Sequence, residues 1–92
     1  MEFKFEKNRI YIENDNNECI GEVTFPSTSE NEVSINHTFV DNSLRGQGIA
    51  GRLMVELAEH LRKNGKKAYA TCPYAKKWFD DHSEYNDIYL IK

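Results

Sequence analysis

Residues 40–61, VDNSLRGQGIAGRLMVELAEHL, decide how this chain folds. Small residues stand in the middle of the stretch, at Gly46, Gly48, Ala50 and Gly51, where an amphipathic run begins. The first turn of a helix has backbone N–H groups without intrahelical partners, and the helix dipole makes that end partly positive. Because small residues leave these groups uncovered, the pattern predicts a site for a phosphate or pyrophosphate.

The amphipathic run predicts a helix over residues 48–64. Apolar side chains recur there at the spacing of a single helix face. They are Ile49, Leu53, Leu57 and Leu61, flanked by Ala50, Met54 and Ala58. On the outer side we expect Glu59 and Lys63 to form an i,i+4 ion pair. Gly65 is a typical C-terminal stop.

The first forty residues predict antiparallel strands separated by polar turns. The expected strands cover residues 3–5, 10–12, 19–25 and 32–40, with turns at 14–17 and 26–31. Alternation along the last strand places His37 and Phe39 on the same face as Val33 and Ile35. A bulge in this strand would change the direction in which His37 points.

A short strand over 67–72 follows the helix, with Cys72 on the same face as Ala68 and Ala70. Strand, helix and strand then form one crossover unit, so strands 32–40 and 67–72 should be parallel, with a right-handed connection. Pro73 suits the first turn of another short helix, in which Ala75, Trp78 and Phe79 form a packed face.

Composition indicates an ordinary globular domain. The chain has 92 residues, of which 39% are hydrophobic and 29% charged, and we expect one domain over residues 1–92. No apolar run approaches the roughly 18 residues of a membrane span, and the N-terminus lacks the apolar stretch of a signal peptide. Two cysteines without zinc-type spacing favour a reduced, cytoplasmic setting and no metal.

The net charge of −3 conceals an asymmetry between the two halves of the chain. Residues 1–44 hold three basic and nine acidic side chains, whereas residues 45–92 hold nine basic and six acidic ones. A weakly basic half that contains the glycine-rich turn suits an anionic ligand. Without a dense Lys/Arg stripe, and with a pI of about 5.6, the chain does not carry the charge pattern of a nucleic-acid-binding protein.

The glycines match G-x-G-x-x-G over residues 46–51, but the surroundings argue against a dinucleotide fold. A polar loop at residues 41–44 separates them from the preceding strand, and the strand after the helix ends at Thr71 and Cys72 without a carboxylate. A Walker-type loop is absent too, since no Gly-Lys-Ser/Thr follows.

A second pattern in the same residues is Arg45-x-x-Gly48-x-Ala50. It resembles the pyrophosphate loop, Gln/Arg-x-x-Gly-x-Gly/Ala, of the GNAT superfamily of acyl-CoA N-acetyltransferases. The His-Thr pair at 37–38 and the Cys-Pro-Tyr run at 72–74 resemble the short, single-domain members of that superfamily. The resemblance implies a minimal GNAT-like α/β (α+β) fold: a mixed, mainly antiparallel sheet with one crossover helix and a short C-terminal helix.

The resemblance also implies acetyl-CoA as the co-substrate, with its pantetheine arm lying between the two strands that flank the loop. Backbone groups of Thr38, Phe39 and Val40 would hold that arm. Backbone amides would hold the pyrophosphate, from Arg45, Gly46, Gln47, Gly48, Ile49 and Ala50. The Arg45 side chain would add a charge-assisted contact.

Three side chains are candidates for the chemistry. Cys72 precedes a helix that starts with Pro73, and helix N-termini favour thiolates. Cys72 therefore either accepts the acetyl group, only protonates or orients, or serves as a small packing residue. His37 is either a general base or a hydrogen-bonded core histidine. By resemblance, Tyr74 falls near the tyrosine that protonates the CoA thiolate in many GNAT enzymes, and a packing role is the alternative.

Other aromatic and polar residues have less definite roles. His82, Tyr85 and Tyr89 either border the acceptor site or pack, while Cys19 and His60 are structural or exposed. Relative to the superfamily, hairpins replace the N-terminal helices, and the C-terminal hairpin has shrunk to a tail. Both departures open the side on which an acceptor would bind.

The function expected from these features is acetyl transfer from acetyl-CoA to a small-molecule or peptide amine. One alternative is a module that binds CoA or acyl-CoA without turnover. Another is a protein-interaction module whose glycine turn holds no ligand. The sequence does not identify the amine or the oligomeric state.

Overall fold

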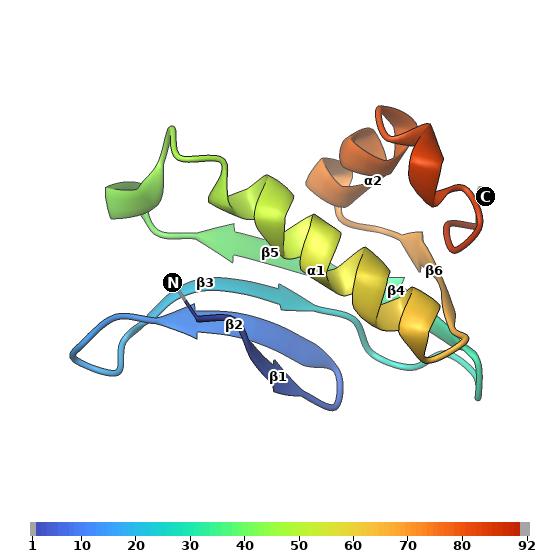
Figure 1. The fold of residues 1–92 in the computed structure, drawn as a ribbon, viewed down its shortest axis with the longest axis horizontal. Coiled ribbons are helices and arrows are strands. Elements are labelled where there is room, and N and C mark those ends of the chain that lie inside the picture. The colour runs from blue at the N-terminus through green and yellow to red at the C-terminus, as the bar shows by residue number, and fades with distance from the viewer. Residues whose placement is uncertain (1, 91–92) are drawn as a thin grey trace.

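The computed structural model describes residues 2–90, and its N-terminal part is an antiparallel meander (Figure 1). The three strands are β1 (Lys4–Glu6), β2 (Arg9–Glu13) and β3 (Cys19–Thr24). Ile10 pairs with Val23 and Ile12 pairs with Gly21, and all four face the interior. The predicted strands in this region are confirmed, with ends that differ by one residue.

The single strand expected over residues 32–40 is wrong, because the chain divides at Asn36. Two strands result, β4 (Glu32–Ile35) and β5 (His37–Val40). The Asn36 N–H donates to the Thr24 carbonyl at 3.2 Å, which turns the chain toward β3. The Ile35 carbonyl instead accepts from the N–H groups of Thr71 and Cys72 at 3.0 and 3.2 Å.

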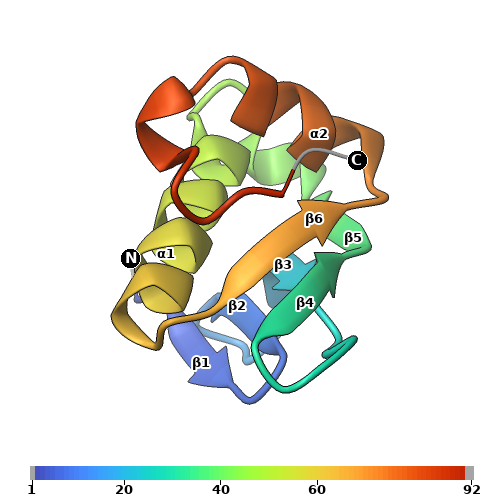
Figure 2. The same ribbon diagram turned by 90° about the vertical axis from the view of Figure 1, so that its right-hand side faces the viewer.

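This division produces two sheets in place of one. A four-stranded antiparallel sheet has the order β1-β2-β3-β5, and a two-stranded sheet pairs β4 with β6 (Lys67–Ala70). The β4–β6 pair is parallel, as the crossover rule predicts (Figure 2). The predicted parallel pairing is wrong for β5, which pairs with β3 instead. Beyond Asn36 the face alternation is broken: Val33 and Ile35 are buried, while His37 and Phe39 are exposed.

Helix α1 (Ile49–Lys63) covers the inner face of the antiparallel sheet, and its predicted extent is confirmed to within one residue at each end. It packs over Gly21 of β3, where an added Cβ would lie 3.6 Å from Leu53 Cδ1, an ordinary contact distance. The core stripe is buried as predicted: Ile49, Leu53, Met54, Leu57, Ala58 and Leu61. Among residues 2–90, no helix is long and apolar enough to cross a lipid bilayer.

Helix α2 (Pro73–Asp80) begins after the predicted N-cap, Cys72, and buries Trp78 and Phe79 as expected. A short 3-10 turn (Ser83–Tyr85) leads into a tail beside β6. There the Ala68 N–H donates to the Ile88 carbonyl at 2.8 Å. The tail thus covers part of the β6 edge (Figure 2).

The 3-10 turn that precedes the tail supplies a partner for Glu59, because it contains Tyr85. The Glu59 carboxylate accepts a hydrogen bond from the Tyr85 hydroxyl at 3.1 Å and pairs with Arg62 Nη1 at 3.3 Å. No ion pair joins Glu59 to Lys63 among the described residues, so the predicted i,i+4 pair is wrong. Tyr85 is brought to Glu59 by tertiary packing, which helix spacing alone does not reveal.

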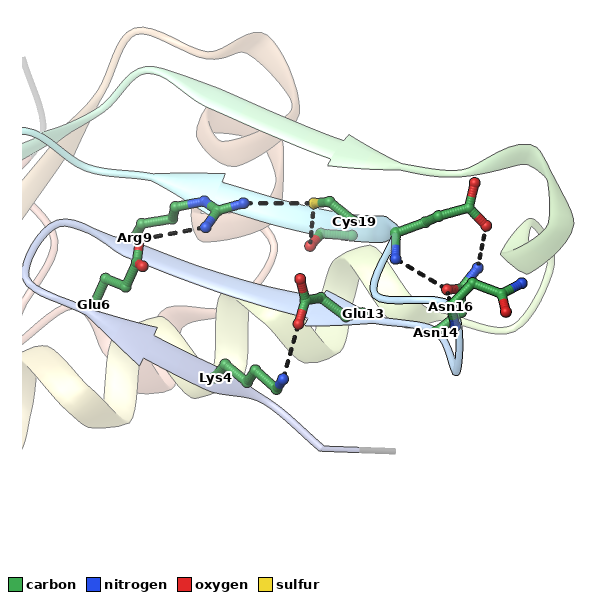
Figure 3. Close-up of polar contacts among 9 residues, drawn as sticks. Lys4, Glu6, Arg9, Glu13, Asn14, Asn16 and Cys19 are labelled. Carbon is green, nitrogen blue, oxygen red and sulfur yellow. Dashed lines mark hydrogen bonds and ion pairs between the residues drawn. The ribbon is translucent and has the colours of Figure 1, made fainter.

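Ion pairs cover the outer face of the meander (Figure 3). Lys4 Nζ donates to Glu13 at 2.8 Å, between β1 and β2. Arg9 lies over the Tyr11 ring and donates to Cys19 Sγ at 3.7 Å. Cys19 is half-buried and belongs to this surface network, which agrees with the structural role expected for it.

His60 generates a prediction about stability. Its ring lies 5.3 Å from Phe5 and 6.3 Å from Phe25, and burial, followed by the charges of Lys66 and Lys63, lowers its pKa. Near pH 6 the unfolded chain therefore binds more protons at this residue, so stability falls as the pH drops. Thermal melts between about pH 7.5 and 5.5 should show a larger loss of stability in the wild type than in His60→Gln. Parallel pH profiles would contradict this role.

Candidate functional site

The loop between β5 and α1 is held in shape by its own hydrogen bonds. A 3-10 turn (Asn42–Leu44) is capped by Asp41, whose carboxylate accepts from Ser43 Oγ at 2.6 Å and Ser43 N at 3.0 Å. These two bonds, the side-chain bond first, lower the pKa of Asp41. Gly46 and Gly48 follow with φ of 82° and 72°, the left-handed region that glycine adopts without steric cost.

The loop uses some of its amides internally and leaves others uncommitted. The Arg45 N–H donates to the Asn42 carbonyl at 3.2 Å, and the Gln47 N–H donates to the Leu44 carbonyl at 3.3 Å. Within residues 2–90, no backbone carbonyl accepts from Gly46, Gly48, Ile49 or Ala50. The sequence predicted that six backbone amides, from Arg45 to Ala50, bind a pyrophosphate. Four of these six have N–H groups without a backbone acceptor among the described residues.

A hollow of about 250 Å³ opens at this turn. Its lining comes from the end of β5, the loop, the first turn of α1 and the start of α2 (Figure 1). The lining residues are Val40, Leu44, Arg45, Gly46, Gly48, Ile49, Ala50, Gly51 and Tyr74. A Cβ built on Gly46 or Gly48 would meet no atom within 4 Å, so the two glycines border open space. The hollow is smaller than a typical ligand pocket of roughly 300–1,000 Å³, so it suits one part of a larger anion.

Strand β5 presents backbone groups toward the gap that the division at Asn36 creates. The Asp41 N–H donates to the Ile20 carbonyl of β3 at 2.9 Å. Because bonded and non-bonded residues alternate in an antiparallel pair, Phe39 also directs its peptide groups toward β3. Thr38 and Val40 then direct theirs away from β3, into the gap. Phe39 pairs with Glu22 and is 38% exposed, on the outer face.

Cys72 lies where β6 and β5 separate. It is half-buried at the N-cap of α2, and its Sγ donates to Thr38 Oγ1 at 3.7 Å. The thiol makes no hydrogen bond to the backbone of α2, so it does not act as a side-chain cap. The fold therefore brings Cys72 and Thr38 together from positions 34 residues apart.

Tyr74 stands at the other side of the hollow, in the first turn of α2. Gly51 of α1 faces it: an added Cβ there would lie at ordinary contact distance, 3.8 Å from Tyr74 Oη and 3.5 Å from Trp78 Nε1. Burial, and then the charge of Cys72, raise the pKa of Tyr74. The phenol therefore keeps its proton at neutral pH, as a proton donor must. The sequence identified Gly51 only as a small residue of the turn, because its contact with α2 is tertiary.

His37 does not join this group. The expectation of a core histidine is wrong, because its side chain is 54% exposed and its Nε2 lies 3.6 Å from Glu22 Oε1. Glu22 also accepts a hydrogen bond from Arg9 Nε. The alternation of side chains along β5 places His37 on the opposite face from Thr38. Sequence patterns gave no signal for Glu22, since the contact joins separate strands.

The remaining aromatic residues pack around α2. His82 stacks on Trp78 with ring centroids 3.9 Å apart, and its Nδ1 lies 2.6 Å from the Trp78 carbonyl oxygen. Tyr85 also stacks on Trp78, and Tyr89 stacks on Phe79 at 4.6 Å. All three residues therefore have packing contacts, and Tyr89 also lines a hollow of about 440 Å³ beside β6, so the second role left open for it stays a prediction.

A family model described as GCN5-related N-acetyl-transferase matches residues 9–88. Since the match spans most of the sequence, the chain belongs to the GCN5-related N-acetyltransferase (GNAT) family, and its fold is the mixed α+β fold of that family. It is therefore an enzyme of the acetyltransferase class. Comparison with curated proteins gave no match.

Solved structures agree with this assignment. The solution structure of a GCN5-like protein from Staphylococcus aureus is 37% identical, with a TM-score of 0.81 over 97% of this chain and 87% of that one. Tetrahymena GCN5 is 19% identical, with a TM-score of 0.61 over 84% of this chain and 51% of that one. A ribosomal-protein-alanine N-acetyltransferase from Brucella melitensis is 23% identical, with a TM-score of 0.60 over 91% and 64%. The last two likenesses establish the fold alone.

Proposed function

We propose that this chain transfers an acetyl group from acetyl-CoA to a small-molecule or peptide amine. One observation supports the proposal: the C-terminal end of β5 lies beside the unpaired backbone amides of the glycine turn, and its N-terminal half lies beside the Cys72 thiol. Val40 lines the hollow beside the glycine turn, and Thr38 contacts Cys72. An extended pantetheine arm beside β5 would connect these two places in the manner of an added strand.

The residues present fit the anionic part of coenzyme A. Amides of Gly46, Gly48, Ile49 and Ala50 supply donors at the positive end of α1, and only part of the cofactor needs to enter the hollow. Arg45 is exposed at the rim and has no ion-pair partner among residues 2–90, so its guanidinium can pair with a phosphate. The peptide groups of Thr38 and Val40 would bind the amides of the pantetheine arm.

Two routes of transfer are compatible with the site. In the covalent route, the Cys72 sulfur takes the acetyl group from the thioester and then passes it to the amine. In the direct route, the amine attacks acetyl-CoA itself while Cys72 orients the acetyl group. Both need a proton for the CoA thiolate, which Tyr74 would provide.

A base must also remove a proton from the amine. His37 retains this role in the proposal only if the acceptor enters from the outer face, where its ring lies beside Glu22. A module that binds acyl-CoA without turnover remains the alternative. An amine-dependent release of CoA distinguishes the enzyme from that binding module.

Two matched glycine variants test the binding site. Gly48 and Gly65 flank α1 at its two ends, with φ of 72° and 67°, and neither would meet an atom within 4 Å of an added Cβ. Gly48→Glu and Gly65→Glu should therefore each lose about 1–2 kcal/mol of stability. Only Gly48→Glu should weaken CoA binding in calorimetry, by about tenfold or more, because it obstructs and repels the phosphates. Equal CoA affinity in the two folded variants would refute the assigned site.

Intact-protein mass spectrometry tests the route of transfer. After incubation with acetyl-CoA and no amine, the covalent route predicts one retained acetyl group in the wild type and none in Cys72→Ser. Addition of a mixed amine panel should then remove the group with further release of CoA thiol. Cys19→Ser is the matched control, because Cys19 lies in the surface network of the meander, and it should acetylate like the wild type. An unmodified wild type that still releases thiol with amines would favour direct transfer, and no release at all would favour the binding module.

A further inference from the structure

The Thr38 hydroxyl faces the Cys72 thiol across the gap between β5 and β6. The Sγ–Oγ1 distance is 3.7 Å, and both side chains are half-buried. Among residues 2–90, this is the one side-chain hydrogen bond that Cys72 makes. The sulfur makes no capping hydrogen bond to the backbone of α2. Thr38 is therefore the side chain that sets the direction of the thiol.

We propose that Thr38 is a positioning residue that acts through Cys72. Its hydroxyl holds the thiol toward the gap and donates a hydrogen bond to the sulfur once the thiol has lost its proton. The inference rests on the covalent route of the proposed function, in which Cys72 receives the acetyl group. It adds a side-chain role for Thr38 to the backbone role in binding the pantetheine arm.

The chemistry of a hydroxyl permits both states of the contact. A threonine hydroxyl accepts and donates hydrogen bonds, so it accepts from the neutral thiol and rotates to donate to the thiolate. A hydrogen bond to a charged group is stronger than one between neutral groups. The same hydroxyl can therefore hold the sulfur in place in both states, and the thiolate is the nucleophile.

The acetyl step balances without any further reagent. A bond forms between Cys72 Sγ and the acetyl carbon, and the bond between that carbon and the CoA sulfur breaks. Tyr74 donates its proton to the CoA sulfur and is reprotonated by the proton that left Cys72, so the products are acetyl-Cys72, free CoA thiol and an unchanged Tyr74. No group is oxidised or reduced.

The test uses the Cys19→Ser protein, in which Cys72 is the remaining thiol. Thr38→Val keeps the branched shape and removes the hydroxyl, whereas Thr38→Ser keeps the hydroxyl. Three quantities are measured: the rate of Cys72 alkylation by iodoacetamide, the rate of acetyl gain from acetyl-CoA, and CoA affinity by calorimetry. Thr38→Val should lower both rates about tenfold, while Thr38→Ser stays within about twofold of the parent. CoA affinity should be the same in all three proteins, because the backbone of residue 38 is unchanged.

Parent-like alkylation and acetylation in Thr38→Val would overturn the proposal. Equal losses in Thr38→Val and Thr38→Ser would also overturn it, because a hydroxyl role requires rescue by serine. If Thr38→Val fails to fold, the Thr38→Ala and Thr38→Ser pair decides in the same way. If the parent gains no acetyl group, the covalent route fails separately, and the alkylation rates alone decide the role of Thr38.

Discussion

Three backbone hydrogen bonds around Asn36 determine how the rest of this molecule is arranged. The Asn36 N–H bonds to β3, whereas the neighbouring Ile35 carbonyl bonds to the chain that leaves β6. One continuous segment thereby serves two sheets, and its second half separates from β6. The separation gives β5 an edge without a neighbouring strand among the described residues. Thr38 and Cys72 lie where it begins, and the glycine turn lies where it ends.

The glycine turn and α2 complete the site from opposite sides. Left-handed backbone at Gly46 and Gly48 orients the chain so that α1 begins with uncovered amides. Tyr74 and Trp78 lie against Gly51 of α1, and the start of α2 lies beside the hollow. Backbone donors thus come from one helix terminus, while the candidate proton donor comes from the other helix.

Sequence patterns were sufficient for features that depend on local periodicity. Helix α1, its buried stripe, the N-cap at Cys72 and the burial of Trp78 follow from spacing and from a single proline. The division at Asn36 was not predictable in this way, because alternation reveals which face a residue occupies but not which neighbouring strand it bonds to. The predicted face of His37 is wrong because the alternation of Val33 and Ile35 does not continue across this division. The hydrogen bond from Tyr85 to Glu59 was missed because tertiary packing brings the 3-10 turn to α1, and helix spacing does not reveal that contact.

The central claim is that uncommitted backbone N–H groups along β5 and the glycine turn bind coenzyme A. The most direct test is a CoA titration of the 15N-labelled chain, followed by amide chemical shifts. Saturable changes should be largest at Gly46, Gly48, Ile49 and Ala50, and should extend along β5 to Val40 and Thr38. Unchanged shifts at these six amides at about 1 mM CoA, with or without changes elsewhere, would contradict the account.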